Sequence, residues 1–176
     1  MMKQVLFKLI TVGDGFVGKT TLLRRYVEGL FYEIPKITIG VDFYLKRLIY
    51  KTYEVAFQLW DFGGQKQFRF MQNRYIGGAS GAFLLYDLSE PKSINNAEEW
   101  INLVRSQDKD LPIILFGIKY DLVEPDSIND DVFIDLMLKN KLLVNIKTSS
   151  KTGLDIDYAF ELMMKNLIGK NSLNNK

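Results

Sequence analysis

Apolar and polar residues alternate along the chain in patterns that separate strands from helices. Short, almost unbroken apolar runs are typical of strands buried on both faces; they occur at residues 4–12, 82–86, 112–117 and 142–147. Residues 41–50 and 53–60 instead alternate between apolar and polar positions. They predict an antiparallel hairpin that turns near Lys51 and Thr52.

Helical periodicity fills most intervals between these strands. Apolar residues on the stripes Ile94–Ala97–Ile101–Val104 and Ile156–Ala159–Phe160–Met163–Leu167 predict two helices that each bury one face. Helices are also predicted over residues 18–29 and 128–139, and the mixed, glycine-ended residues 66–78 are predicted to form a mobile helix. Residues 31–40 show no period and contain a proline, so we expect a long loop there.

A hairpin followed by alternating strands and helices predicts an α/β fold. We expect a mostly parallel six-stranded sheet with right-handed crossovers and helices on both faces. The 176 residues suit one domain over 1–168, with a short, polar, frayed tail at 169–176. Ligands of such sheets bind at the carboxyl ends of the strands.

Composition narrows the chemistry. With 23 basic and 21 acidic residues, the net charge of +2 offers no footprint for nucleic acid. The sequence has no histidine, so no imidazole serves as base or metal ligand, and no cysteine, which excludes thiolate metal sites and a thioester or thioether lipid anchor in this chain. No signal peptide or membrane-length apolar run is found, so we expect a cytoplasmic protein.

The strongest local pattern is a glycine-rich loop between a strand and a helix, G-x-x-x-x-G-K-T over residues 13–20. Its backbone N–H groups and the helix N-terminus suit a polyphosphate, Lys19 would reach the β- and γ-phosphates, and Thr20 would ligate Mg²⁺. A glycine-rich turn without a ligand is the alternative, which the flanking strand and helix disfavour. The predicted contacts are Gly13, Gly15, Phe16, Val17, Gly18, Lys19, Thr20 and Thr21.

Further polar residues follow the other predicted strands. Asp61 ends a strand, where a carboxylate can hold Mg²⁺ or simply cap a loop. Gly64 would offer its N–H to a γ-phosphate at a place where a side chain would obstruct approach. Asp121 can accept hydrogen bonds from the ring N–H and exocyclic amine of guanine, and adenine lacks that pair of donors.

The order of these motifs resembles that of the small GTPases of the Ras superfamily, nearest the Rab-like members, over residues 4–168. The resemblance is carried by the phosphate loop, Thr38-Ile39-Gly40, Asp61-x-x-Gly64-Gln65, Lys119-x-Asp121 and Ser149-Ser150-Lys151. It implies the phosphate-loop GTPase fold and a switch that binds GTP or GDP with Mg²⁺ and hydrolyses GTP slowly. It also implies an effector, an exchange factor and a GTPase-activating protein as partners.

The same resemblance assigns roles to individual residues. Gln65 would orient the attacking water, and Thr38 would close over Mg²⁺ when the γ-phosphate is present, so that hydrolysis releases the 31–40 and 62–72 loops. At the base, Phe31 would lie against the purine unless it is only a helix-end staple. The aliphatic stem of Lys119 and a backbone N–H of the Ser149, Ser150 and Lys151 segment would complete the base site.

Three features depart from the family pattern. Ile118 stands where the family has an asparagine, and losing two hydrogen bonds of about 1 kcal/mol each would weaken guanine binding roughly thirtyfold. Phe16 is bulky for a phosphate loop, and it points either outward toward a partner or toward the 62–70 loop. No arginine occupies an obvious catalytic position, and Gly15 leaves room for a partner's arginine, so we expect slow intrinsic hydrolysis.

Residues 60–65 and 119–122 resemble the septum-initiation branch, which also lacks the asparagine. One alternative function is a nucleotide-binding interaction module with little turnover, which Ile118 and Phe16 favour, whereas Gln65, Thr38 and Thr20 favour an enzyme. Another is a phosphate-loop ATPase or nucleotide kinase. Asp121, Thr38 and the lack of an arginine cluster typical of a lid argue against it.

Overall fold

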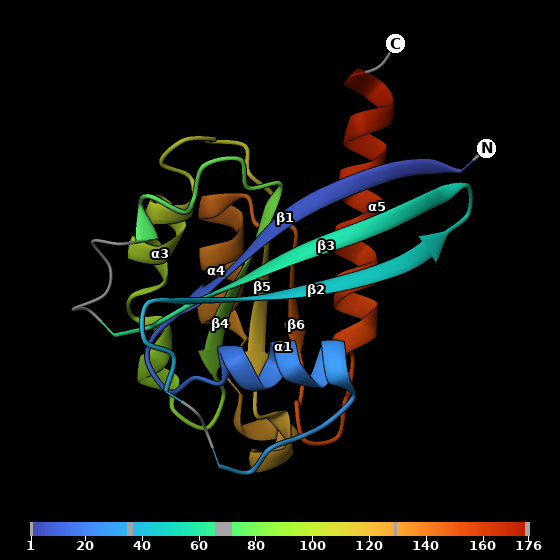
Figure 1. Cartoon of the computed structure of the whole chain (residues 1–176). Helices are drawn as coiled ribbons and strands as arrows, with labels where there is room; N and C mark the ends of the chain where they lie inside the picture. The colour runs from blue at the N-terminus through green and yellow to red at the C-terminus, as the bar shows by residue number, and fades with distance from the viewer. Residues whose placement is uncertain (1, 35–36, 66–71, 129, 175–176) are drawn as a thin grey trace.

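Six strands form one twisted sheet in the order β2-β3-β1-β4-β5-β6 (Figure 1). The computed structural model describes residues 2–34, 37–65, 72–128 and 130–174. Only β2 runs antiparallel to its neighbour, as predicted for the hairpin. The strands are β1 (Lys3–Gly13), β2 (Val41–Tyr50), β3 (Tyr53–Phe62), β4 (Gly81–Asp87), β5 (Ile113–Ile118) and β6 (Val144–Lys147).

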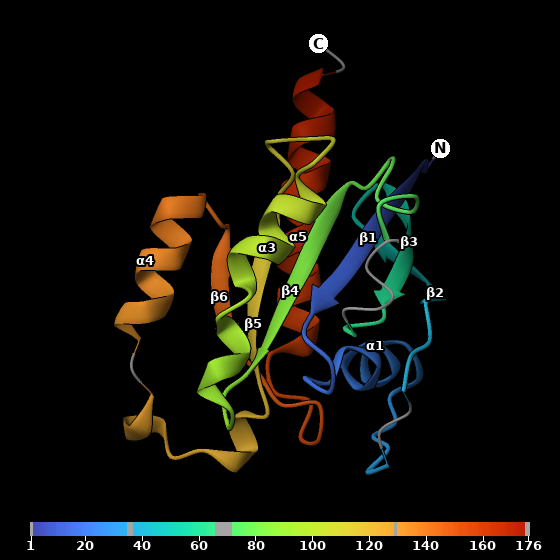
Figure 2. The same ribbon diagram turned by 90° about the vertical axis from the view of Figure 1, so that its left-hand side faces the viewer.

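Helices cover both faces of the sheet, which confirms the predicted α/β class. They are α1 (Lys19–Glu28), α3 (Ala97–Val104), α4 (Asp131–Asn140) and α5 (Ile156–Asn174), with short 3₁₀ turns η2 (Pro91–Ile94), η3 (Tyr120–Leu122) and η4 (Pro125–Ser127). One core packs α1 and α5 against the sheet, and a second packs α3 and α4 against the opposite face (Figure 2).

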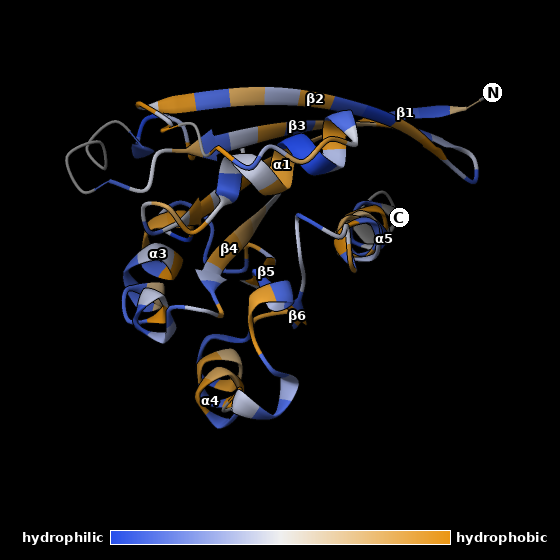
Figure 3. Cartoon of the chain, turned by 90° about the horizontal axis from the view of Figure 1, so that it is seen from below, coloured by the Kyte–Doolittle hydropathy of each residue, from blue (hydrophilic) through white to orange (hydrophobic). Residues whose placement is uncertain are grey.

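The pattern of buried residues follows from this layering. Every residue of β4 and β5 is buried, because helices cover these central strands on both sides. Exposed and partly buried residues alternate along most of the edge strand β2, and Figure 3 shows hydrophobic and hydrophilic residues following one another along this strand. The unbroken apolar runs therefore predicted the central strands well, because neither face of those strands contacts solvent.

Two predicted helices differ in the structure. Ile94 was expected to share a helix with Ala97, but it ends η2, and α3 begins separately after Asn95 and Asn96. The break allows the Asn96 side chain to leave the helix axis and contact the phosphate loop. Six of the thirteen residues of the predicted helix over 66–78, residues 66–71, lie outside the described residues; of the rest, Gln72 is helical and residues 73–75 and 77–78 form turns.

The prediction that the chain frays after Ile168 is wrong for residues 169–174. Helix α5 continues to Asn174, and the Lys170 ammonium donates to the Asp110 carbonyl at 3.2 Å, which ties the added turn to the body of the protein. The boundary between a 1–168 domain and a tail stays a prediction. None of the helices in the described ranges has the length and apolar character needed to cross a membrane.

Four segments that end or follow parallel strands lie at the same edge of the sheet, where these strands have their carboxyl ends. The phosphate loop follows β1, Asp87 ends β4, Lys119 follows β5, and the segment from Thr148 follows β6. This common edge is where the fold class places ligands.

Candidate functional site

Lys19 begins α1 and turns back into the phosphate loop. Its side chain is buried, with 5% of the residue exposed, and its ammonium donates to the carbonyls of Gly13 at 2.9 Å and Asp14 at 2.7 Å. Burial lowers the pKa of Lys19 to about 8, against the opposing charges of Asp61 and Asp14. A buried cation held by carbonyl dipoles is suited to an anionic ligand such as a phosphate.

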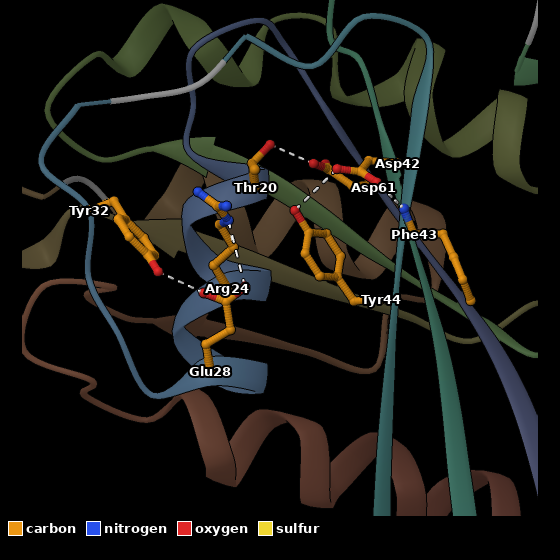
Figure 4. A network of polar contacts seen from close by, with 8 residues as sticks. All are labelled: Thr20, Arg24, Glu28, Tyr32, Asp42, Phe43, Tyr44 and Asp61. Atoms are coloured by element: carbon orange, nitrogen blue, oxygen red, sulfur yellow. Dashed lines mark hydrogen bonds and ion pairs between the residues drawn. The ribbon is translucent and has the colours of Figure 1, made fainter.

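Thr20, Thr38 and Asp61 meet beside this lysine, although they come from α1, the 31–40 segment and β3. The Thr20 hydroxyl donates to Asp61 Oδ2 at 2.5 Å, as Figure 4 shows, and the Thr38 hydroxyl lies 3.1 Å from the same oxygen. The two threonine hydroxyls are 2.7 Å apart. The three residues predicted to bind a metal are thus in mutual contact.

The chemistry of this group fits Mg²⁺. Asp61 is fully buried, and burial raises its pKa against the hydrogen bond from Thr20 and the charge of Lys19. Within the described part of the chain, Asp61 Oδ1 has no hydrogen-bond partner. A buried carboxylate oxygen in need of a partner, next to two hydroxyls, is a donor set that suits a hard cation.

The 62–65 segment lies directly against the phosphate loop. A Cβ on Gly64 would sit 2.4 Å from the carbonyl carbon and oxygen of Asp14, so this approach requires glycine. The Gly63 N–H donates to the Gly40 carbonyl at 2.8 Å. Gln65 lines a pocket together with Lys19, Thr20, Thr38 and Gly64, and its Cγ lies 3.8 Å from the position of a Cβ on Gly15. The predicted catalytic amide therefore lies over the loop.

A second cavity of about 340 Å³ adjoins this pocket. Phe16, Gly18 and Thr21 line both spaces, so the pocket and the cavity are neighbouring parts of one candidate site. The lining of the cavity includes most residues predicted to bind the base or the neighbouring loop, namely Val17, Phe31, Lys119, Asp121, Ser150 and Lys151. Of the predicted loop contacts, Gly13 does not line either space and instead offers its carbonyl to Lys19.

Asp121 lies on η3 and is exposed to this cavity. Its Oδ1 accepts a hydrogen bond from the Ser149 hydroxyl at 2.5 Å, and the Tyr120 N–H donates to the Thr148 carbonyl at 3.0 Å. Ser149 is buried and does not line the cavity. Its hydroxyl therefore restrains the Asp121 carboxylate. The base contact predicted for a backbone N–H of this segment stays a prediction.

Sequence reasoning missed the partner of Lys119. The Lys119 ammonium pairs with Asp87 Oδ2 at 2.5 Å, and Asp87 Oδ1 accepts from the N–H and hydroxyl of Ser89. This ion pair fixes the end of the Lys119 side chain while its stem lines the cavity. A carboxylate directly after the apolar run 82–86 was the available signal, because that run ends at the ligand edge of the sheet.

The structure explains two of the unusual residues. Ile118 is 1% exposed, and its Cδ1 lies 2.9 Å from where a Cβ on Gly18 would sit, so it supports the phosphate loop by apolar packing. Phe16 is 67% exposed, with a left-handed φ of 65°, and stands at the junction of the two spaces. Its side chain therefore points outward.

A small polar network holds the start of the 31–40 segment to α1. The Arg24 guanidinium lies 4.5 Å from the centre of the Tyr32 ring, and the Tyr32 hydroxyl donates to Glu28 at 3.0 Å (Figure 4). Tyr32 also lines the 340 Å³ cavity, next to Phe31. The network thus restrains one wall of the cavity, and the sequence pattern gave no indication of it.

The strand order, the phosphate loop and the two adjoining spaces together define a phosphate-loop α/β protein. Sequence comparisons identify the family within this class. The sequence model of the Ras family matches residues 8–169. Ras-related protein Rab-19 of Xenopus laevis is 36% identical over 168 residues, which is 95% of this chain and 79% of the relative. Rab-19 of Mus musculus is 36% identical over 169 residues, covering 96% of this chain and 78% of the relative.

A plant relative shows the same degree of likeness. Ras-related protein RABA4a of Arabidopsis thaliana is 33% identical over 171 residues, covering 95% of this chain and 75% of the relative. The chain belongs to the Ras family, and it is a Rab-like small GTPase by its relatives. The resemblance predicted from the motifs is confirmed at this level, whereas the likeness to the septum-initiation branch stays a prediction.

Proposed function

We propose that this protein binds GTP together with Mg²⁺ and hydrolyses it slowly to GDP, so that it acts as a molecular switch. The observation that supports this most is the pair of adjoining spaces, one lined by the buried Lys19 and the other by Asp121. Membership of the Ras family supports a guanine nucleotide as the ligand.

Base selectivity would come from Asp121. Guanine offers a ring N–H and an exocyclic amine to one carboxylate, whereas adenine would leave that carboxylate desolvated without matching donors. Ser149 would hold the carboxylate in place, while Phe31 and the stem of Lys119 lie against the faces of the base. The expected result is a preference for GTP over ATP.

At the phosphate end, Thr20, Thr38 and Asp61 would hold Mg²⁺, which when bound offsets negative charge on the β- and γ-phosphates. The Lys19 ammonium would bind phosphate oxygens, and the Gly64 N–H would donate to the γ-phosphate. Gln65 would orient the attacking water by hydrogen bonding, because a neutral amide is a poor base. No arginine lines the phosphate pocket among the described residues, which supports slow turnover and an arginine supplied by a GTPase-activating partner.

The switch would reside in Thr38 and in residues 63–65. In the proposed switch, bound Mg²⁺ and the γ-phosphate would add contacts to both, and hydrolysis would remove those added contacts and change the surface that effectors recognise. Parts of the predicted loops, residues 35–36 and 66–71, lie outside the described residues. An exchange factor would act on the same segments to free GDP.

Single-turnover phosphate release tests hydrolysis directly. Wild-type protein loaded with GTP and Mg²⁺ should release phosphate slowly, Gln65→Leu should be slower still, and Lys19→Ala should release none above background. Wild-type release no faster than that of Lys19→Ala would overturn the proposal in favour of a nucleotide-binding module. With Phe16 exposed and Ile118 packed under the loop, neither residue now favours that module.

A further inference from the structure

Asp14 places a carboxylate inside the phosphate loop, between Gly13 and Gly15. Its carbonyl accepts a hydrogen bond from Lys19 at 2.7 Å, and its backbone lies against Gly64. A negative charge at this place opposes the binding of a polyphosphate unless the protein holds it away from the ligand. The geometry of its partners indicates how that is done.

Two donors from the start of α3 hold the Asp14 carboxylate. The Trp100 indole N–H donates to Oδ1 at 2.8 Å, and the Asn96 amide donates to Oδ2 at 2.7 Å. Trp100 is 1% exposed and belongs to the core on the sheet face opposite α1. Both carboxylate oxygens are therefore engaged on the α3 side of the loop.

Asn96 serves Asp14 instead of its own helix. It occupies the position before the first residue of α3, where asparagine commonly accepts a hydrogen bond from the first turn. No such side-chain cap bond forms, and the amide is directed to the phosphate loop instead. Helix α3 therefore lacks a side-chain cap from Asn96, and the phosphate loop receives a hydrogen bond from this residue.

We propose that Asp14 is a positioning residue of the nucleotide site, and that Asn96 and Trp100 hold its charge away from the phosphates. The inference rests on the proposed function. Through the Asp14 carbonyl the same anchor fixes the partner of Lys19, so the start of α3 becomes part of the binding machinery. This role goes beyond the motif residues, since Asp14 acts through the loop and through Lys19.

The proposal predicts an asymmetry that a merely structural contact would not produce. Removing a donor leaves a less restrained carboxylate beside the phosphates, whereas removing the charge leaves nothing to repel them. Trp100→Phe should therefore weaken nucleotide binding more than Asp14→Asn. Combining the two substitutions should restore binding, even though the double variant has lost more native contacts.

Release of a fluorescent GDP analogue into excess GDP measures this effect. We expect about tenfold faster release from Trp100→Phe, less than about threefold from Asp14→Asn, and a return to within about threefold of wild type in the double variant. Trp60→Phe changes the other tryptophan of the chain, which stacks with Lys8 away from Asp14, and should leave release unchanged. Melting temperatures should fall in both variants that lack Trp100, without recovery in the double variant.

Asn96→Ala avoids a change in the core and should release the analogue about threefold faster, with rescue by Asp14→Asn. Equal release rates for Trp100→Phe and the double variant, together with no rescue of Asn96→Ala, would overturn the inference while leaving the proposed function intact. Wild-type protein that fails to retain the analogue would instead overturn the proposed function, and this inference with it.

Discussion

The two ends of the site are built differently. At the phosphate end, Lys19 and Asp61 are buried, and the hydroxyls of Thr20 and Thr38 already contact the carboxylate. At the base end, Asp121 is exposed and Lys119 is half-buried, each fixed by one partner, Ser149 or Asp87. If the proposed function holds, we expect the phosphate end to supply most of the affinity for the nucleotide and the base end to select which nucleotide is bound.

The difference in burial between the two ends follows from the secondary-structure elements on which their residues lie. The phosphate end joins β1, α1 and β3, whose side chains pack into the core around Leu22 and Phe57. The base end lies on connections after β5 and β6 that contact each other through backbone and side-chain hydrogen bonds. Changes at the phosphate end should therefore abolish binding, whereas changes at the base end should alter selectivity or release.

Lys19→Ala should have the largest effect. Loss of a buried, charge-assisted contact worth about 3 kcal/mol would weaken GTP binding by at least about 100-fold. Because Lys19 lacks an anionic ligand in the free protein, the unfolding free energy of the nucleotide-free form should not fall by a comparable amount. Titration calorimetry on nucleotide-free protein checks the affinity, with the exposed Lys165→Ala as the control. A loss below tenfold would contradict the assignment of affinity to the phosphate end.

Asp121→Asn should lower GTP affinity by about 10- to 100-fold and leave ATP affinity unchanged, because only guanine donates a pair of hydrogen bonds to the carboxylate. The readout is the ratio of the two affinities in the same calorimetric series. Asp126→Asn, on the neighbouring turn η4, is the matched control and should preserve the ratio. Equal losses for GTP and ATP would show that Asp121 supports the fold of the loop rather than base choice.

Ile118→Asn should move stability and nucleotide retention in opposite directions. A polar amide in place of a buried side chain should cost about 2 kcal/mol of unfolding free energy. Because Ile118 lines the base cavity, the introduced amide would face the base and should slow GDP release, up to about tenfold. Leu115→Asn, on the same strand but in the opposite core, should lose stability without slowing release. Faster release from Ile118→Asn would contradict the expected role of the asparagine.

Arg24→Ala should have the smallest effect, about threefold faster GDP release, since a partly exposed cation–π contact contributes about 0.5–1 kcal/mol. Losing it would loosen Tyr32 and the cavity wall beside Phe31. The exposed Arg47→Ala serves as the control in the same release assay. An unchanged rate would mean that the wall is held by other contacts.

Local sequence patterns predicted much of the fold and of the candidate site. The phosphate loop, the hairpin and the fully buried strands β4 and β5 were predictable, because glycine spacing and apolar runs encode them directly. The convergence of Lys19, Thr20 and Asp61 also followed, since parallel strands bring their carboxyl ends to one edge. The order of the motifs predicted the family, and the resemblance to that family supplied the roles predicted for Thr38 and Gln65.

Contacts between distant side chains could not be predicted. The bonds from Asn96 and Trp100 to Asp14 span 82 and 86 residues and depend on where α3 begins, which the Ile94–Ala97 spacing obscured. Similarly, the pairing of Lys119 with Asp87 requires the β4–β5 register. The continuation of α5 past Ile168 was missed because polar composition alone suggested fraying.

The identity of the nucleotide that co-purifies with the protein tests the central claim most directly. Denaturing the freshly purified protein and separating the released nucleotides by chromatography requires no variant and no assumption about rate. A GTP-hydrolysing switch with a strong phosphate end should retain GDP, with a minor share of GTP, at close to one nucleotide per chain. An adenine nucleotide, or an empty site in protein that also fails to bind added GDP, would contradict the account.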